Sequence, residues 1–128
     1  YFKYKKDPLG SGLEVCEPII KGTNIRTITI PDTILYNKVS IPITRIGNHA
    51  FVGCYRLTLT LPSTIKEIGN DALCYTVYCK ATTPPTMGSN EGPTVVYVPA
   101  SDDDSIINAY KSADGWNKDY RKFYEYEF

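Results

Sequence analysis

A six-residue phrase occurs twice in this chain, and its repetition limits the folds that the sequence can adopt. Residues 46–51 read Ile-Gly-Asn-His-Ala-Phe and residues 68–73 read Ile-Gly-Asn-Asp-Ala-Leu, so the phrase returns after 22 residues. An aliphatic residue followed by proline recurs beside it, at residues 30–31, 61–62 and 98–99. A fixed period in the twenties predicts a repeat protein, in which each unit buries its apolar face only by stacking on its neighbours.

The period also predicts the fold class and its division along the chain. A repeat of this length is typical of a leucine-rich-repeat solenoid, a right-handed β-rich superhelix with short helical segments. We expect the repeats to occupy residues 28–99. Residues 1–27 and 100–128 depart from the repeat, so we expect them to form an N-terminal and a C-terminal cap. At 128 residues, the whole chain is expected to be one structural domain.

Short segments in which apolar and polar residues alternate predict strands with one buried face. Such segments occur at residues 13–17, 28–30, 57–61, 77–80 and 94–98. The aliphatic side chains that we expect to face the core are Ile28, Ile30, Ile46, Leu59, Leu61, Ile68, Val96 and Val98. The extra residues 35–39 predict a small hairpin with Asn37 and Lys38 at its tip.

The C-terminal segment has a different pattern, which predicts a short helix and a closing strand. Asp102, Asp103 and Asp104 precede an apolar stretch at residues 106–110, and carboxylates at this place favour a helix N-cap and first turn. Aromatic and acidic residues alternate over residues 123–128, which predicts a strand. The aromatic residues that we expect in the core of this cap are Tyr110, Trp116, Tyr120, Tyr124 and Tyr126.

Composition and charge argue against several classes of function. The 14 basic and 14 acidic residues give a net charge of zero, so the chain has no excess of basic groups for nucleic acid or an anionic membrane. No apolar run approaches the length of a membrane span, so we expect no direct membrane insertion. The chain begins at Tyr1, and we interpret it as trimmed behind a leader sequence.

The four cysteines leave two pairing states open. Cys16, Cys54, Cys74 and Cys79 lack the close paired spacing of a zinc site. Cys54 and Cys79 also fall where the repeat places inward-facing apolar residues, and unpaired cysteine is among the most buried residue types. The sequence therefore favours buried free thiols, and at least one disulfide is the alternative.

The repeated phrase resembles a known family. Residues 46–54 have the form Ile-Gly-Asn-x-Ala-Phe-x-x-Cys and lead through Leu57 to Leu61-Pro62. This pattern closely resembles the BspA-like leucine-rich repeats of bacterial surface proteins. The other segments that resemble the family are Tyr36-Asn37-Lys38 before residues 44–47, residues 77–86, residues 97–100, residues 109–111 and Trp116. Together they extend the resemblance from residue 28 to the last residue.

The resemblance implies a location and a role. Members of this family are typically secreted or surface-anchored proteins of host-associated anaerobic bacteria, and several are implicated in adhesion to host matrix proteins or to other bacteria. The family shares no catalytic residues. The resemblance therefore implies a secreted or cell-surface binding module for a protein partner, either host matrix or bacterial surface.

No residue pattern in the sequence indicates catalysis. His49 is the only histidine and takes the variable position of the repeated phrase, where a turn residue is the simpler interpretation. The run of Asp102, Asp103 and Asp104 lacks the spaced oxygen ligands and central glycine of an EF-hand loop. Sequence motifs for phosphate loops, nucleophile elbows and zinc-protease helices are absent. We therefore expect no enzyme activity, no cofactor and no metal site.

One outward-facing row of side chains is the candidate binding face. Alignment of the repeats places Thr29, Thr60, Tyr78 and Tyr97 at the same outward position of successive strands. Neighbouring exposed aromatic rings are good anchors for a protein or sugar partner. The alternative is that C-terminal residues pack over the two tyrosines. We expect protein–protein interaction or adhesion through this row, with a structural spacer unit or glycan binding as the alternatives.

Overall fold

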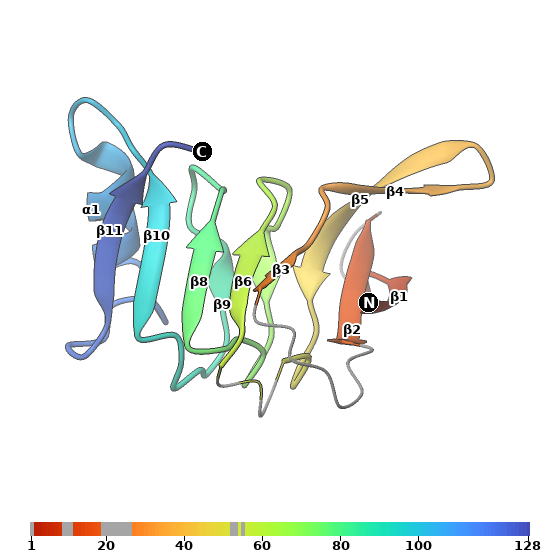
Figure 1. The fold of residues 1–128 in the computed structure, drawn as a ribbon, viewed down its shortest axis with the longest axis horizontal. Helices are drawn as coiled ribbons and strands as arrows, with labels where there is room; N and C mark the ends of the chain where they lie inside the picture. The colour runs from red at the N-terminus through yellow and green to blue at the C-terminus, as the bar shows by residue number, and fades with distance from the viewer. Residues whose placement is uncertain (1, 9–11, 19–26, 52–53, 55) are drawn as a thin grey trace.

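Two β-sheets and one helix make up the part of the chain that the structure describes (Figure 1). The computed structural model describes residues 2–8, 12–18, 27–51, 54 and 56–128. From β6 to β10, successive strands belong alternately to a five-stranded sheet (β6, β8 and β10) and a six-stranded sheet (β7 and β9). Each time the chain passes from one sheet to the other, it adds one strand to the sheet that it enters. Over this part of the chain, the two sheets are therefore extended in alternation, one strand at a time.

The first sheet contains six strands and is of mixed type. Its order is β1-β2-β5-β7-β9, and β4 pairs with β5 outside this path. The strands are β1 (Phe2–Lys6), β2 (Leu13–Pro18), β4 (Thr33–Tyr36), β5 (Val39–Ile46), β7 (Glu67–Ile68) and β9 (Thr86–Met87). The pairs β1–β2 and β4–β5 are antiparallel, whereas β2, β5, β7 and β9 pair in parallel.

The second sheet contains five strands and is parallel throughout, in the order β11-β10-β8-β6-β3. The strands are β3 (Thr27–Thr29), β6 (Thr58–Leu61), β8 (Thr76–Cys79), β10 (Val95–Pro99) and β11 (Lys122–Tyr126). Helix α1 (Ser105–Ser112) joins β10 to β11 and packs against both. Parallel neighbours need such a crossover, because a tight turn can join only antiparallel strands.

The leucine-rich-repeat solenoid predicted from the sequence is wrong. The described ranges form two mostly parallel sheets with two antiparallel pairs, and they contain a single helix near the C-terminus where the prediction had short helical segments along a superhelix. These residues form no closed solenoid. The repeated phrase ends in a turn at residues 48–51 and again at residues 70–71. His49 and Asp71 have φ values of 61° and 49° there, so a right-handed helix does not continue from either turn.

The period is nevertheless expressed in the strand register and in the core. Ile46 of β5 pairs with Ile68 of β7, its equivalent in the next repeat. The predicted core positions are confirmed, since each is at most 5% exposed: Ile28, Ile30, Ile46, Leu59, Leu61, Ile68, Val96 and Val98. They belong to one hydrophobic cluster that takes side chains from both sheets and from α1. The predicted strands correspond to β2, β3, β6, β8, β10 and β11, with small shifts at their ends.

The predicted hairpin is confirmed, and it projects from the first sheet (Figure 1). Tyr36 of β4 pairs with Val39 of β5, which leaves Asn37 and Lys38 as a two-residue turn. Both turn residues have positive φ, 49° and 64°, as a type I′ turn requires. Leu35, Tyr36 and Val39 are 71%, 64% and 58% exposed, so the hairpin carries apolar side chains into solvent.

Helix α1 begins differently from the sequence prediction. Asp104 is its N-cap residue but has a left-handed backbone, and its carboxylate makes no capping hydrogen bond. The hydroxyl oxygen of Ser101 instead accepts a hydrogen bond from the backbone N–H of Ile106, at 3.3 Å. The Asp103 carboxylate accepts one from the N–H of Ser105, at 3.1 Å. Within the predicted run of Asp102, Asp103 and Asp104, the Asp103 carboxylate therefore accepts a hydrogen bond at the start of the helix, and the Ser101 hydroxyl supplies a second acceptor.

The aromatic residues of the C-terminal segment divide into a buried and an exposed group. Tyr110 and Trp116 are fully buried, as predicted. Tyr120, Tyr124 and Tyr126 are 49%, 46% and 45% exposed, so the prediction that they form the core of a cap is wrong. Tyr124 and Tyr126 are exposed because β11 pairs in parallel with β10, which places both side chains on the outward face of the second sheet.

Candidate functional site

The outward face of the second sheet carries one row of side chains that crosses all five strands. The parallel pairing aligns Thr29, Thr60, Tyr78, Tyr97 and Tyr124, and we call these five residues the Thr–Tyr row. The structure therefore brings together the four residues that the sequence placed on one face, in the expected order. Neighbouring strands lie about 4.8 Å apart, so adjacent side chains of the row are within contact distance.

Tyr78 and Tyr97 form a stacked pair within this row. Their ring centroids are 4.2 Å apart, and their planes differ by 6°. Because the two residues lie in register on neighbouring strands, their rings stack along the direction that runs from strand to strand. One face of the Tyr78 ring is thus covered by Tyr97. The other face is directed toward β6, where Thr60 is its register partner.

C-terminal residues pack beside this stack and leave the second face of Tyr78 open. The Tyr126 centroid lies 5.1 Å from that of Tyr78 and 6.1 Å from that of Tyr97, with steep ring angles of 82° and 78°. A ring packed on the second face of Tyr78 would lie much farther from Tyr97 than the 6.1 Å observed for Tyr126. Tyr126 therefore lies at the edges of both rings. Phe128 also meets Tyr78 edge-on, at 6.4 Å. The alternative in which C-terminal residues cover the tyrosines is therefore realised for Tyr97, because Tyr124 packs on it at 5.5 Å with ring planes 31° apart, whereas Tyr78 stays half-buried beside the groove.

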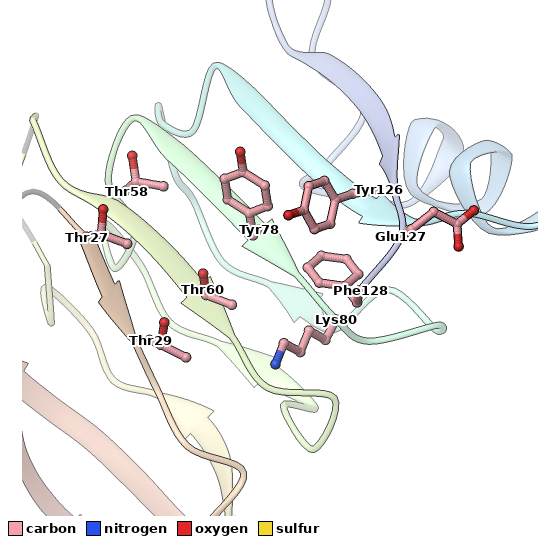
Figure 2. Close-up of a pocket in the computed structure, with 9 residues that line it drawn as sticks. All are labelled: Thr27, Thr29, Thr58, Thr60, Tyr78, Lys80, Tyr126, Glu127 and Phe128. Carbon is pink, nitrogen blue, oxygen red and sulfur yellow. The ribbon is translucent and has the colours of Figure 1, made fainter.

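An open groove of about 570 Å³ lies next to the Tyr78 ring. We call it the strand-face groove, and its lining residues are Thr27, Thr29, Thr58, Thr60, Tyr78, Lys80, Tyr126, Glu127 and Phe128. Figure 2 shows the threonines of β3 and β6 on one side and the aromatic rings on the other. The groove thus combines a hydroxyl-bearing side with an apolar side.

The four threonines offer unpaired hydroxyl groups to this groove. Thr27 and Thr29 are exposed, and Thr58 and Thr60 are half-buried. None of their hydroxyls hydrogen-bonds to another residue in the part of the chain that the structure describes. A hydroxyl donates one hydrogen bond and accepts two, so each can engage a ligand without first breaking a protein contact.

A rigid layer of side chains lies beneath the row. Leu59, Leu61, Val77 and Cys79 alternate with the outward residues of β6 and β8, and all four are 0% exposed.

Burial raises the pKa of Tyr78, and the neighbouring Tyr97 and Tyr126 raise it further. The Tyr78 phenol is therefore protonated at neutral pH and can donate a hydrogen bond.

The sequence missed part of this site. Thr27 and Thr58 repeat the Thr-x-Thr pattern of β3 and β6, so a search for two outward positions per strand would have found them. Tyr126 and Phe128 are different, because the C-terminal alternation predicts a strand but does not say which strand it pairs with. Lys80 follows Cys79 of β8 directly, and its place at the groove depends on where that strand ends.

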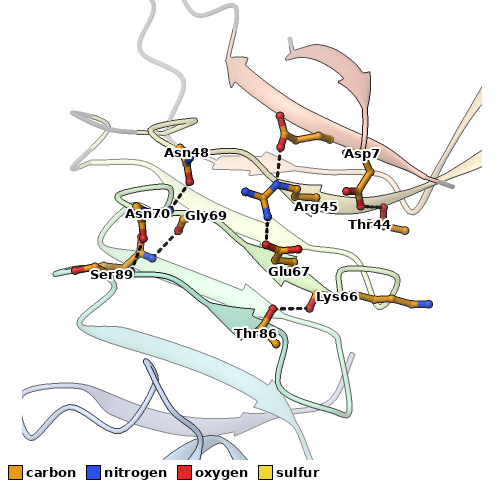
Figure 3. A network of polar contacts seen from close by, with 12 residues as sticks. Asp7, Thr44, Arg45, Asn48, Lys66, Glu67, Gly69, Asn70, Thr86 and Ser89 are labelled. Carbon is orange, nitrogen blue, oxygen red and sulfur yellow. Dashed lines mark hydrogen bonds and ion pairs between the residues drawn. The ribbon is translucent and has the colours of Figure 1, made fainter. Parts of the chain in front are cut away.

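A second group of polar side chains lies on the first sheet (Figure 3). Register aligns Glu14 of β2, Arg45 of β5 and Glu67 of β7. The Arg45 Nε–H donates to a Glu14 carboxylate oxygen at 2.5 Å, and its Nη1 forms an ion pair with Glu67. Lys5 also pairs with Glu14, at 3.0 Å. Each charge already has a partner of opposite sign, so this group links neighbouring strands of the sheet and offers no free charge to a ligand.

The asparagines of the repeated phrase link successive turns. The Asn48 side-chain oxygen accepts a hydrogen bond from the N–H of Asn70, and the Asn70 oxygen accepts one from the N–H of Ser89, both at 2.8 Å (Figure 3). A Cβ added to Gly69 would lie 2.4 Å from the Asn48 oxygen, so glycine is required for this close approach. These contacts explain the Gly-Asn pair as a structural element.

The remaining candidate residues do not gather into a reactive centre. His49 is exposed in its turn, with Nδ1 3.9 Å from a carboxylate oxygen of Asp71. No group of three His, Cys, Asp or Glu side chains that could hold a metal ion occurs among the described residues. All four cysteines are free thiols; of the two predicted to face inward, Cys79 is buried and Cys54 is only half-buried, while Cys74 is buried and Cys16 half-buried. In the same ranges no helix is long and apolar enough to cross a membrane.

Comparison of the chain with protein-family models, with curated proteins and with solved structures found no match. The likeness of residues 46–54 to BspA-like repeats therefore remains a resemblance of sequence.

Proposed function

We propose that this chain is a non-catalytic binding module of a secreted or cell-surface bacterial protein, and that it attaches to host or bacterial partners. The observation that carries the proposal is the strand-face groove beside the Thr–Tyr row. A parallel sheet fixes the positions of the side chains around it, and binding sites combine apolar surface with a few well-placed polar groups. The resemblance of residues 46–54 to bacterial surface proteins supports the same role.

The lining of the groove favours binding over chemistry. Among the described lining residues, Glu127 has the one side-chain carboxylate and Lys80 the one side-chain amine, and there is no histidine or cysteine. Catalysis by a nucleophile and base needs two such groups within hydrogen-bond reach of each other. The tyrosine rings and threonine hydroxyls instead supply apolar area and hydrogen bonds, which are the components of reversible recognition.

The proposal is tested by removing the two stacked rings. We expect Tyr78→Ala combined with Tyr97→Ala to reduce binding at least tenfold, measured on immobilised extracellular-matrix proteins and on whole bacterial cells. The matched control combines Tyr36→Ala with Tyr75→Ala, since these tyrosines are 64% and 53% exposed and lie outside the groove. Unchanged binding in the Tyr78 and Tyr97 variant would eliminate this face and favour a spacer role.

A second variant keeps the test decisive if loss of both rings unfolds the chain. Thr60→Gln places a longer side chain in the groove and leaves the buried layer intact, so the fold should be retained. Circular dichroism and thermal unfolding check the fold of each variant. We expect Thr60→Gln to weaken binding by blocking the groove, and full binding by a folded variant would count against the site.

A further inference from the structure

The Tyr78 ring presents one accessible face inside the strand-face groove. Tyr97 stacks on its first face at 4.2 Å, and Tyr126 stands at its edge. The second face is directed toward Thr60 and lines the groove. An aromatic face binds apolar C–H surface that is flat enough to lie against it. The ligand therefore needs a flat surface of C–H groups.

Opposite this ring, the threonines form two short parallel rows. Register pairs Thr27 with Thr58 and Thr29 with Thr60, so four hydroxyls lie on two neighbouring strands. A ligand that lies over them without hydrogen bonds would leave these groups desolvated and unpaired, which is unfavourable for each group. The ligand therefore also needs several groups that donate and accept hydrogen bonds.

Charge and size restrict the ligand further. The side chains of Lys80 and Glu127 contribute one positive and one negative charge, so the side chains of the lining favour neither an anion nor a cation. The groove volume of about 570 Å³ lies within the range of about 300–1,000 Å³ typical of sites for small molecules. A standard protein interface instead covers about 800 Å² on each partner.

A sugar ring meets these requirements together. A pyranose with mostly equatorial hydroxyls has a flat face of C–H groups, and each hydroxyl both donates and accepts hydrogen bonds. We propose that the strand-face groove binds an uncharged saccharide chain, with one sugar ring stacked on the open face of Tyr78 and its hydroxyls hydrogen-bonded to Thr58 and Thr60. This inference rests on the proposed function and names the ligand class of the same site.

The first experiment titrates the full chain with three uncharged probes: cellohexaose, xylohexaose and N-acetylchitohexaose. We expect at least one to bind by isothermal titration calorimetry. Combining Thr58→Val with Thr60→Val removes two hydroxyls and nearly preserves shape and strand preference, so we expect at least a tenfold loss of affinity from a folded variant. Tyr78→Phe keeps the ring and should lose less affinity than Tyr78→Ala. Thr33→Val is the matched control, because Thr33 is exposed on β4 outside the groove.

The second experiment separates a saccharide from a protein ligand. Immobilised mucin is presented untreated and after periodate oxidation, which opens sugar rings and leaves the polypeptide largely unchanged. Loss of binding after oxidation, together with binding of a free probe that depends on Tyr78, supports the inference. If none of the three probes binds, and Tyr78-dependent binding to mucin survives oxidation, the inference that the ligand is a saccharide is overturned. The proposed function as a binding module is retained in that case. If Tyr78→Ala alters no binding to the probes, mucin, matrix proteins or cells, both are overturned.

Discussion

Cys74 is a buried thiol whose ionisation is coupled to unfolding. Burial raises the pKa of Cys74 from 9.0 to about 12, because the thiolate would lose its contact with water. The unfolded chain therefore loses this proton near pH 9, whereas the folded chain keeps it until about pH 12. The contribution of this group to stability is present in full below pH 9 and is lost as the pH rises toward 12.

We predict that Cys74→Ala makes the free energy of unfolding less dependent on pH between 9 and 11. One strongly shifted group changes this free energy by at most about 1.4 kcal/mol per pH unit. Burial also raises the pKa of Cys79 and of Tyr110, so the variant should retain a weaker decline. Urea titrations at several pH values measure both curves. The smaller side chain lowers stability at every pH, and equal slopes would show that Cys74 ionises normally in the folded chain.

The elements of this fold were predictable where neighbouring residues determine them. Alternation in β6 and β8 identified the outward positions of Thr60 and Tyr78, because a strand alternates its faces at every residue. The Asn37-Lys38 turn was likewise readable, since it needs only two residues that accept positive φ. Local patterns therefore found most of the Thr–Tyr row and the hairpin.

The elements that were wrongly predicted depend on contacts between distant residues. The period suggested a right-handed superhelix with short helical segments, yet no helix follows the repeated turns at residues 48–51 and 70–71, and the described helix lies near the C-terminus. Tyr126 reaches Tyr78 only because α1 returns the chain to pair β11 with β10. No spacing in the sequence encodes that contact, so the aromatic side of the groove was missed.

The hairpin of β4 and β5 is a second surface with exposed apolar residues, and it allows a prediction at the scale of one element. We expect a triple variant, with Leu35→Thr, Tyr36→Thr and Val39→Thr, to keep the melting temperature nearly unchanged. These side chains are mostly exposed, and threonine suits a strand. Binding to the partner found for the strand-face groove should also persist. If a folded triple variant lost that binding, the hairpin would have to be assigned as part of the binding surface.

Hydrogen bonds from side chains of the C-terminal segment connect this segment to the loop that follows β8. The buried guanidinium of Arg121 donates to five backbone carbonyls, those of Asn90, Gly92, Pro93, Gly115 and Trp116. The Trp116 indole N–H donates to the carbonyl of Pro85 at 2.9 Å, and the Tyr110 hydroxyl to that of Ala81 at 2.7 Å. The loop after β8 and the C-terminal segment therefore form one folded unit.

Deletion of residues 101–128 should consequently disrupt the whole molecule. It removes β11 and α1, exposes the edge of β10 and uncovers the buried side chains Val96 and Val98. An open strand edge is a template for association, so we predict that the shortened chain aggregates or fails to unfold cooperatively. Size-exclusion chromatography and urea titration measure these two properties. Deletion of Glu127 and Phe128 alone is the matched control, because β11 ends at Tyr126, and this variant should stay soluble and folded. A soluble, monomeric and cooperatively folded chain after the long deletion would show that residues 101–128 are an appendage to an independent fold.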